Sequence, residues 1–272
     1  MRAAKLLSLV LLVAACDKSD KASVRDMAAE AKARDEKLKK EAEEIAAKDR
    51  AGVETMVPKI IENRRPIDQR MLMAYGLIPD VSKWKERKVC PDAEIEKVAP
   101  TPEKRRILLV NQENLFTMAG KHDAGPIPGF RTKAADEAQW MRRAEGKESL
   151  LLERAMPDSA DKAKAQLEAI EYVNGFRYLG IGLFTGFRAS RVEGTSASPA
   201  RAEGWTLIVD LEEKKVICHV ESWGENLTRK DGGLSIGRAV YEDAWSMWVH
   251  TTAKNLEAVS KVLTVEGAPK KK

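Results

Sequence analysis

Apolar and polar residues divide this chain into three zones before any motif is considered. Residues 6–15 form an apolar run interrupted only by Ser8, and Arg2 and Lys5 precede it. This run is well short of the roughly 20 residues that a membrane-spanning helix needs, whereas a positive start followed by a short apolar run is typical of a signal peptide. The pattern therefore predicts that residues 1–15 are a signal peptide.

The second zone, residues 16–52, is charged throughout and has no sustained apolar face. Residues 17–50 hold ten acidic and ten basic residues, many alanines, and no glycine, proline or aromatic residue. Pairs such as Glu36 and Lys40 support a helix by roughly 0.2–0.5 kcal/mol each. The positions that recur at spacings of three and four are mostly small and include Asp35, so they make a poor coiled-coil seam. We expect a solvated helical stalk about 40–50 Å long, with a partner-binding helix or weak coiled coil as alternatives.

The third zone, residues 53–265, has the composition of a globular domain. Pro58, Pro66 and Pro79 interrupt its first part. Because proline removes a helical hydrogen bond and clashes with the preceding turn, residues 53–90 are predicted to form short helices rather than one long helix.

Residues 103–117 leave two alternatives open. Thr101 and Pro102 are typical of a helix start, with threonine as the N-cap and proline at the first helical position. Residues 107–110, however, would also suit a buried strand. The element stays undecided between helix and strand.

The C-terminal half alternates between the helical and the strand periodicity. Spacings of three and four predict helices over residues 133–145, 159–173 and 238–263. Residues 176–187 are rich in aromatic and β-branched residues and predict a strand, whose glycines would let another element approach closely. Residues 188–203 follow as a loop.

Residues 205–211 and 216–220 form the clearest hairpin of the chain. If Glu213 and Lys214 occupy the turn, the alternation of a strand places six side chains on one face. These six are Leu207, Val209, Leu211, Val216, Cys218 and Val220.

These elements predict an α+β fold: a small, mainly antiparallel sheet, arranged as a meander, covered by helices and preceded by the charged stalk. The domain would span residues 53–265. Residues 266–272 would follow as a short basic tail.

Charge excludes one class of partner. Without residues 1–15 the chain loses two of its 47 basic residues and keeps 42 acidic ones, so the net charge is 45 − 42, or +3. Both signs are interspersed along the chain. Nucleic-acid binding needs Lys and Arg clustered on one face, usually with aromatic residues between them. We therefore expect no nucleic-acid partner.

The end of the apolar run, Val13-Ala14-Ala15-Cys16, resembles the lipobox of bacterial lipoproteins. The resemblance covers this segment alone, and the mature domain resembles no named family. It implies that the peptide is cut before Cys16, that Cys16 carries the lipid, and that acyl chains such as palmitate anchor the chain to the membrane of the cell envelope, facing the periplasm. In enteric-type sorting Asp17 would favour the inner membrane, but that rule varies between bacterial groups, and inner and outer membrane both stay open.

With Cys16 assigned to the lipid, two cysteines remain, Cys90 and Cys218. An even pair in an oxidising compartment is consistent with a disulfide. Two buried free thiols are the alternative.

No motif assigns a catalytic, cofactor-binding or metal-binding residue. Gly180, Gly182 and Gly186 superficially resemble a dinucleotide-binding loop, but the helix that would follow such a loop is missing from the pattern. The three histidines do not stand at metal-ligand spacing, and no CxxC or HExxH occurs.

Two weaker candidate sites remain. In the predicted hairpin, Asp210, His219 and Glu221 share the face opposite the core, where carboxylates beside an imidazole could run acid–base chemistry. Trp245 and Trp248 stand one helical turn apart and would either join the core or line a ligand groove between helix and sheet.

Three functions follow from these patterns. The first is a non-enzymatic envelope lipoprotein that binds a protein partner or plays a structural role. The alternative is a module that holds a small apolar ligand between the sheet and the C-terminal helix, and a hydrolase-like enzyme using Asp210 and His219 comes last. No identity for a partner or a ligand follows from the sequence.

Overall fold

The computed structural model describes residues 20–81, 83–112, 115, 157–227 and 238–267. Two compact units divide the chain, Met1–Ala51 and Gly52–Lys272. Cys16, the predicted helix over residues 133–145 and most of the basic tail lie outside the described residues.

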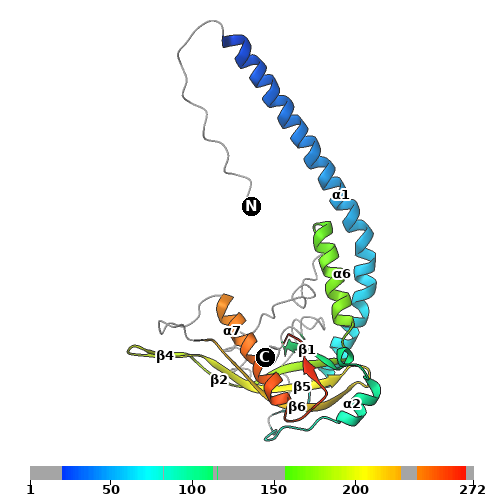
Figure 1. Cartoon of the computed structure of the whole chain (residues 1–272), viewed down its shortest axis with the longest axis vertical. Coiled ribbons are helices and arrows are strands. Elements are labelled where there is room, and N and C mark those ends of the chain that lie inside the picture. The colour runs from blue at the N-terminus through cyan, green and yellow to red at the C-terminus, as the bar shows by residue number, and fades with distance from the viewer. Residues whose placement is uncertain (1–19, 82, 113–114, 116–156, 228–237, 268–272) are drawn as a thin grey trace. The chain divides into compact units, whose positions relative to one another are not determined.

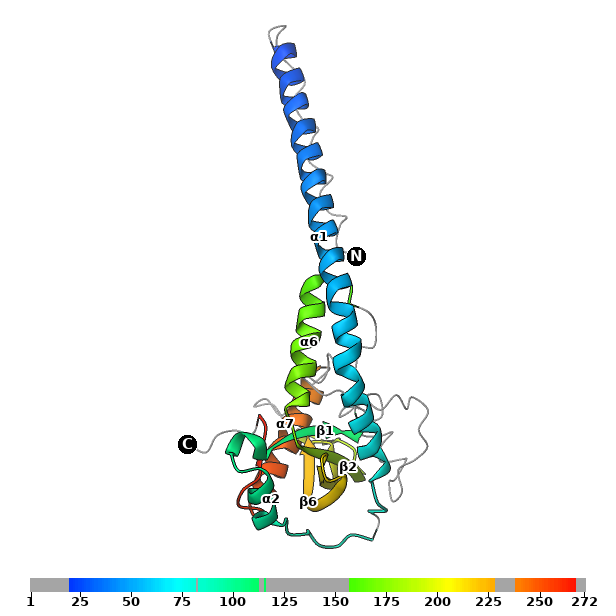
Figure 2. The same ribbon diagram turned by 90° about the vertical axis from the view of Figure 1, so that its right-hand side faces the viewer.

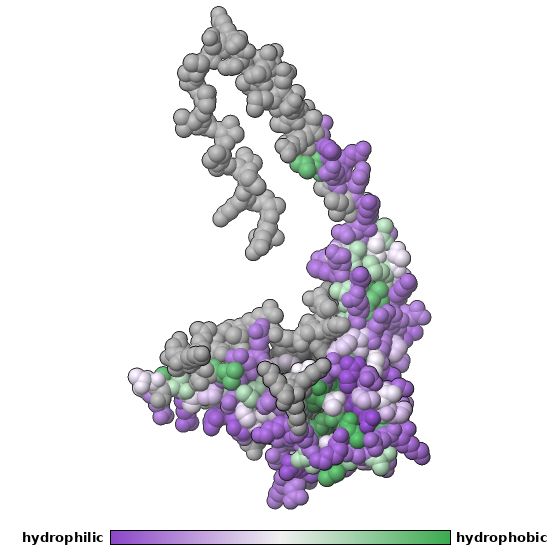
Figure 3. Space-filling view, in the orientation of Figure 1, coloured by the Kyte–Doolittle hydropathy of each residue, from purple (hydrophilic) through white to green (hydrophobic). Residues whose placement is uncertain are grey.

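The described backbone of the first unit is helical from Asp20 to Ala51, as part of helix α1 (Asp20–Gly76). Its surface between residues 36 and 51 is mainly hydrophilic (Figure 3). Lys37 and Glu41 form an ion pair of 3.9 Å one turn apart. The charged helix predicted for this zone is therefore present.

The prediction of short helices over residues 53–90 is wrong, because α1 continues through Pro58 and Pro66 to Gly76. A proline inside a helix costs about 3 kcal/mol. In compensation, one face of this part of the helix is buried in the core of the second unit. The buried residues are Ile60, Ile67, Met71 and Ala74.

The predicted α+β fold is confirmed. Five strands form one sheet in the order β6-β5-β2-β1-β7. Strands β2 (Tyr178–Arg188), β5 (Arg201–Asp210) and β6 (Lys215–Glu225) are antiparallel neighbours and form a meander. Strand β1 (Arg106–Asn111) joins β2 in parallel, and the short β7 (Thr264–Val265) pairs in parallel with β1.

The ambiguous residues 103–117 begin with a single 3-10 turn, η1 (Pro102–Arg105), which leads directly into strand β1. Residues Ile107 to Val110 are all buried, alternately on the two faces of the sheet. A continuous apolar run is typical of a strand that is covered on both faces.

Helices cover both faces of the sheet (Figures 1 and 2). The second-unit part of α1 and helix α6 (Ala160–Asn174) pack on one face. Helix α2 (Asp92–Val98) and helix α7 (Arg238–Leu256) pack on the other. Helix α6 matches the predicted helix over residues 159–173, and the side chain of Ser159 caps it by accepting a hydrogen bond from the Lys162 N–H.

The predicted face of the hairpin is only partly correct. Register shifts between Ile208 and Val209, where Ile217 is the additional residue on β6. Leu207, Val209, Leu211 and Val216 belong to the core against α1 and α6, whereas Cys218 and Val220 belong to the core against α2 and α7. A one-residue bulge changes the face of every residue beyond it.

Two further boundaries differ from the prediction. Residues 188–203 are more than a loop, since they contain the small hairpin β3 (Arg191–Glu193) and β4 (Ser196–Ser198) and the start of β5. The closing helix ends at Leu256 rather than residue 263. There Ser260 donates a hydrogen bond of 2.6 Å to Asp92, and its hydroxyl oxygen accepts the N–H groups of two following residues, so the chain turns toward β7.

Helix α7 approaches β2 closely at Gly182. A Cβ atom at this position would lie 2.9 Å from Nε1 of Trp248. That indole N–H donates to the hydroxyl of Thr206, which also bonds with the hydroxyls of Ser222 and Thr252. The strand glycine thus allows the close approach that the sequence predicted.

Candidate functional site

The structure does not assemble the predicted acid–base group of Asp210, His219 and Glu221. Because of the bulge, His219 lies opposite Leu207, on the face of the sheet that packs against α1 and α6, whereas Asp210 lies opposite Lys215 on the other face. Glu221 shares the face of His219 but is exposed. The bulge thus separates Asp210 from His219 and Glu221, and the hydrolase-like interpretation loses its site.

His219 instead forms an aromatic stack. Its ring lies parallel to Trp84 with the ring centroids 3.7 Å apart, and edge-on to Trp205 at 5.3 Å. Nε2 lies 2.9 Å from the carbonyl oxygen of Glu86, to which it donates in the neutral tautomer. The side chain is only 8% exposed, and this burial lowers the pKa of His219 below its ordinary value. The imidazole is therefore a neutral packing residue.

Stability is expected to fall as pH decreases through the ordinary pKa of histidine, about 6.5. His219 binds a proton more readily in the unfolded chain, where neither burial nor the nearby Lys88 opposes the charge. Its contribution is thus fully present above pH 6.5 and declines below it, by at most about 1.4 kcal/mol per pH unit. Urea unfolding at pH 7.5 and 5.5 measures the change.

The variant His219→Phe keeps a ring against Trp84 and Trp205 but cannot titrate. We expect it to lose less stability than the wild type between the two pH values. A His250→Gln control, at an exposed position of α7, should keep the wild-type dependence. An equal pH dependence in His219→Phe and wild type would contradict this assignment.

Asp210 has a different role, at the end of β5. Its carboxylate accepts hydrogen bonds from Nε and Nη2 of Arg177 at 2.9–3.2 Å and from the backbone N–H groups of Glu212 and Glu213 at 3.0 Å. Burial disfavours the charge on Arg177, but the hydrogen bond and charge of Asp210 outweigh it and raise the pKa of Arg177. Asp210 therefore fixes the β5–β6 turn and holds Arg177.

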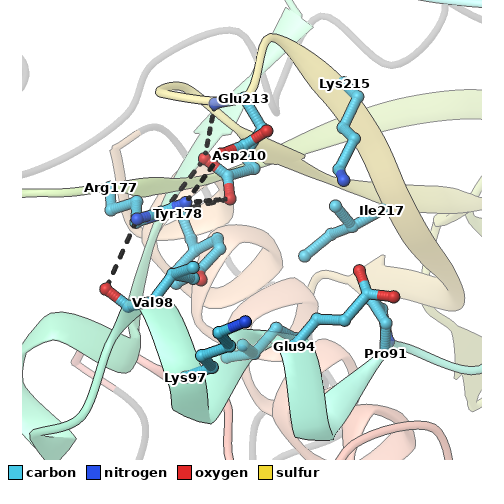
Figure 4. A pocket seen from close by; sticks show the side chains of 11 residues that line it. Pro91, Glu94, Lys97, Val98, Arg177, Tyr178, Asp210, Glu213, Lys215 and Ile217 are labelled. Atoms are coloured by element: carbon cyan, nitrogen blue, oxygen red, sulfur yellow. Dashed lines mark hydrogen bonds and ion pairs between the residues drawn. The ribbon is translucent and has the colours of Figure 1, made fainter.

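A pocket of about 240 Å³ opens beside this ion pair (Figure 4). Helix α2 forms one wall, the start of β2 a second, and the β5–β6 turn a third. Its base is apolar and includes Ile95, the ring of Tyr178 and Ile217. Burial raises the pKa of Tyr178 to about 12, so its hydroxyl is neutral. Three acidic and three basic residues also line it: Glu94, Asp210, Glu213, Lys97, Arg177 and Lys215. Pro91 and Val98 complete the lining.

The sequence pattern does not indicate this pocket. Asp210 was predicted to act in acid–base chemistry, and none of the three cations was a candidate. Lys97 lies on α2, Arg177 directly before β2, and Lys215 at the start of β6. Their sequence spacing carries no signal, and only the fold brings them together.

Cys90 and Cys218 form a disulfide. Both cysteines are buried, in the core that α2 and α7 cover. The bridge joins β6 to the segment between residues 81 and 90, which also carries Trp84 and the Lys88 backbone bridge to His219. Of the two alternatives for these cysteines, the structure contains the bridge.

Trp248 is a core residue, completely buried against Phe184 and Gly182. Trp245 is half-buried beside it. In the described part of the interface between α7 and the sheet, these rings fill the space that the predicted groove would occupy.

No group of three or more His, Cys, Asp or Glu side chains suitable for a metal occurs among the described residues. Over the same residues, no helix combines the length and the apolar character that crossing a membrane requires. Cys16 lies outside them.

No protein-family model, curated protein or solved structure matches this chain.

Proposed function

We propose that this chain is a bacterial lipoprotein, held at the cell envelope by acyl chains on Cys16, whose globular unit binds an envelope protein partner without catalysing a reaction. The observation that carries the proposal is the disulfide between Cys90 and Cys218. Disulfides persist in oxidising compartments such as the periplasm and are rare in the cytosol. The disulfide thus supports export independently of the lipobox.

Helix α1 supports a role as a spacer. From Asp20 to Ala51, at 1.5 Å per residue, it is about 48 Å long. Insertion of so many charged residues into a bilayer would be unfavourable, so we propose that the acyl chains provide the anchor. Two or more such chains give stable attachment.

Part of edge strand β6 is not available for pairing with a strand of a partner protein. An unpaired edge could accept a strand from another protein. Here the outward backbone groups of three alternate residues already have partners. His219 O accepts from Lys88 N at 3.1 Å, Glu221 O from Asn255 Nδ2 at 2.8 Å, and both backbone groups of Trp223 bond with Thr251 Oγ1 at 2.6–3.1 Å.

The small β3–β4 hairpin is the better candidate for partner contact. It lies beyond the end of β2 (Figure 1). Val192 on this hairpin is 71% exposed, the most of any large hydrophobic side chain noted among the described residues. Its neighbour Arg191 is also exposed. Such a tip offers an apolar contact beside a positive charge.

The anchor is tested by replacing Cys16. In a Gram-negative host, the wild type should incorporate an alkyne-labelled palmitate and sediment with membranes. We expect Cys16→Ser to lose the label and the membrane fraction, since a single nucleophilic thiol carries the lipid. A Cys90→Ser/Cys218→Ser control should keep both. Label retained in Cys16→Ser, or wild type found in the cytosol, would overturn the proposal.

The partner is tested in intact cells with a photoreactive amino acid at Val192. We expect a discrete crosslinked product that is absent when the probe replaces the exposed Ile61 on α1. The product should also disappear when Cys16→Ser releases the chain from the membrane. Identical products at both positions, or none at Val192, would argue against partner binding through this hairpin.

A further inference from the structure

The pocket between α2 and the β5–β6 turn contains charges that the protein does not neutralise. Lys97 on α2 and Lys215 on β6 lie on opposite sides of it, and Figure 4 shows both ammonium groups directed toward its interior. Among the described residues neither ammonium has an ion-pair partner, and the same holds for the carboxylate of Glu94 at the margin.

The other charges of the lining are already paired. Arg177 is held by Asp210 at 2.9 Å and by the Glu212 carboxylate at 2.7 Å, and it lies 3.8 Å from Glu213. Asp210 has four donors. The groups left for a ligand are therefore two ammonium groups and one carboxylate.

The volume of the pocket and its apolar base further limit which ligands fit. About 240 Å³ is below the roughly 300–1,000 Å³ of pockets for drug-sized molecules. Ile95 and Ile217 present apolar surface at its base. Since the charges of the six charged lining residues sum to zero, a polyanion would be repelled as much as attracted.

We propose that this pocket binds an apolar α-amino acid through its free carboxylate. The carboxylate lies between Lys97 and Lys215, and the side chain rests on Ile95 and Ile217. An ammonium group, if the ligand has one, faces Glu94. The same carboxylate chemistry is available from a free amino acid or from the C-terminal residue of a peptide. This inference does not rest on the lipid anchor or on the β3–β4 hairpin.

Titration of the purified full-length protein tests the site, with three probes followed by amide NMR. Leucine should give saturable shifts confined to α2, the start of β2 and the β5–β6 turn, with a millimolar dissociation constant. Leucinamide lacks the carboxylate and should bind at least about tenfold more weakly, since a charge-assisted hydrogen bond contributes roughly 1.5–3 kcal/mol. N-acetyl-leucine distinguishes the sources: affinity equal to leucine indicates a peptide C-terminus, and a clear loss indicates the free amino acid.

Matched variants decide whether the shifts belong to this pocket. Lys97→Met and Lys215→Met should each weaken leucine at least about tenfold. Lys104→Met removes an exposed charge outside the lining and should leave affinity unchanged. Unchanged melting temperatures establish that each variant is folded. The proposal is overturned by the absence of saturable shifts with either leucine or N-acetyl-leucine, by equal binding of leucinamide, or by lysine variants that bind like wild type.

Discussion

Removing the disulfide with Cys90→Ala/Cys218→Ala is expected to lower the free energy of unfolding by about 3–5 kcal/mol. The bridge joins residues 128 positions apart. In the chain-entropy account, opening a loop of this length increases the entropy of the unfolded chain and so lowers its free energy by about 5 kcal/mol. Two buried side chains also become smaller, but Ala and Cys differ by one sulfur atom each. For a unit of this size the melting temperature should fall by roughly 6–20 °C.

Thermal and urea unfolding of the full-length protein measure this effect. Wild type treated with reductant under unfolding conditions is the matched control, because it opens the same bridge without changing the sequence. We expect reduced wild type and the double variant to unfold together. If both thiols of untreated protein react with an alkylating reagent, or if the double variant melts within about 2 °C of wild type, the bridge does not contribute as argued.

The bridge has a local consequence as well. Four contacts hold residues 83–90 against β6: the disulfide, the stack of Trp84 on His219, the hydrogen bond between the His219 ring and the Glu86 carbonyl, and the backbone bond from Lys88. When the disulfide is absent, the other three remain, and all of them involve His219. The loss of stability below pH 6.5 should therefore persist in the double variant.

Local patterns in the sequence were sufficient for several elements. Helix α6 has a cap at Ser159, a regular apolar face and a stop at Gly175, so its ends follow from residues close in sequence. Strand β2 and the two strands of the hairpin have a strong β-branched and aromatic content. Where the local signals agree, the α+β class could be predicted.

Long-range packing decided what local signals could not. Pro58 and Pro66 favour a break in α1, but burial of its apolar face against the sheet outweighs them. No residue such as glycine marks the bulge between Ile208 and Val209 in the sequence. The bulge places His219 on the opposite face of the sheet from Asp210. The predicted acid–base group depended on that register.

The pocket could not be predicted for a related reason. Lys97, Arg177 and Lys215 come from a helix, the start of a strand and the strand after a turn. Each is an ordinary surface cation by sequence. Their common location follows from the order of the strands and from the docking of α2, which are properties of the whole second unit.

Replacing Arg177 with methionine is expected to lower the free energy of unfolding by about 3–5 kcal/mol. The Arg177 side chain is 11% exposed and that of Asp210 is 4% exposed, so the variant leaves a buried carboxylate with its main partner removed. Arg177 also donates to the carbonyl oxygen of Val98 at the end of α2. The loss should thus loosen both the β5–β6 turn and one wall of the pocket. Urea unfolding measures the stability.

Glu212→Gln provides a control on the same guanidinium. Glu212 pairs with Arg177 at 2.7 Å, as closely as Asp210 does, but its side chain is 55% exposed. Because solvent screens such a pair, its removal should cost less than about 1 kcal/mol. A double-mutant cycle with Asp210→Asn then isolates the buried pair, and strong coupling is expected. If Arg177→Met and Glu212→Gln destabilise the protein equally, burial does not determine the strength of these pairs.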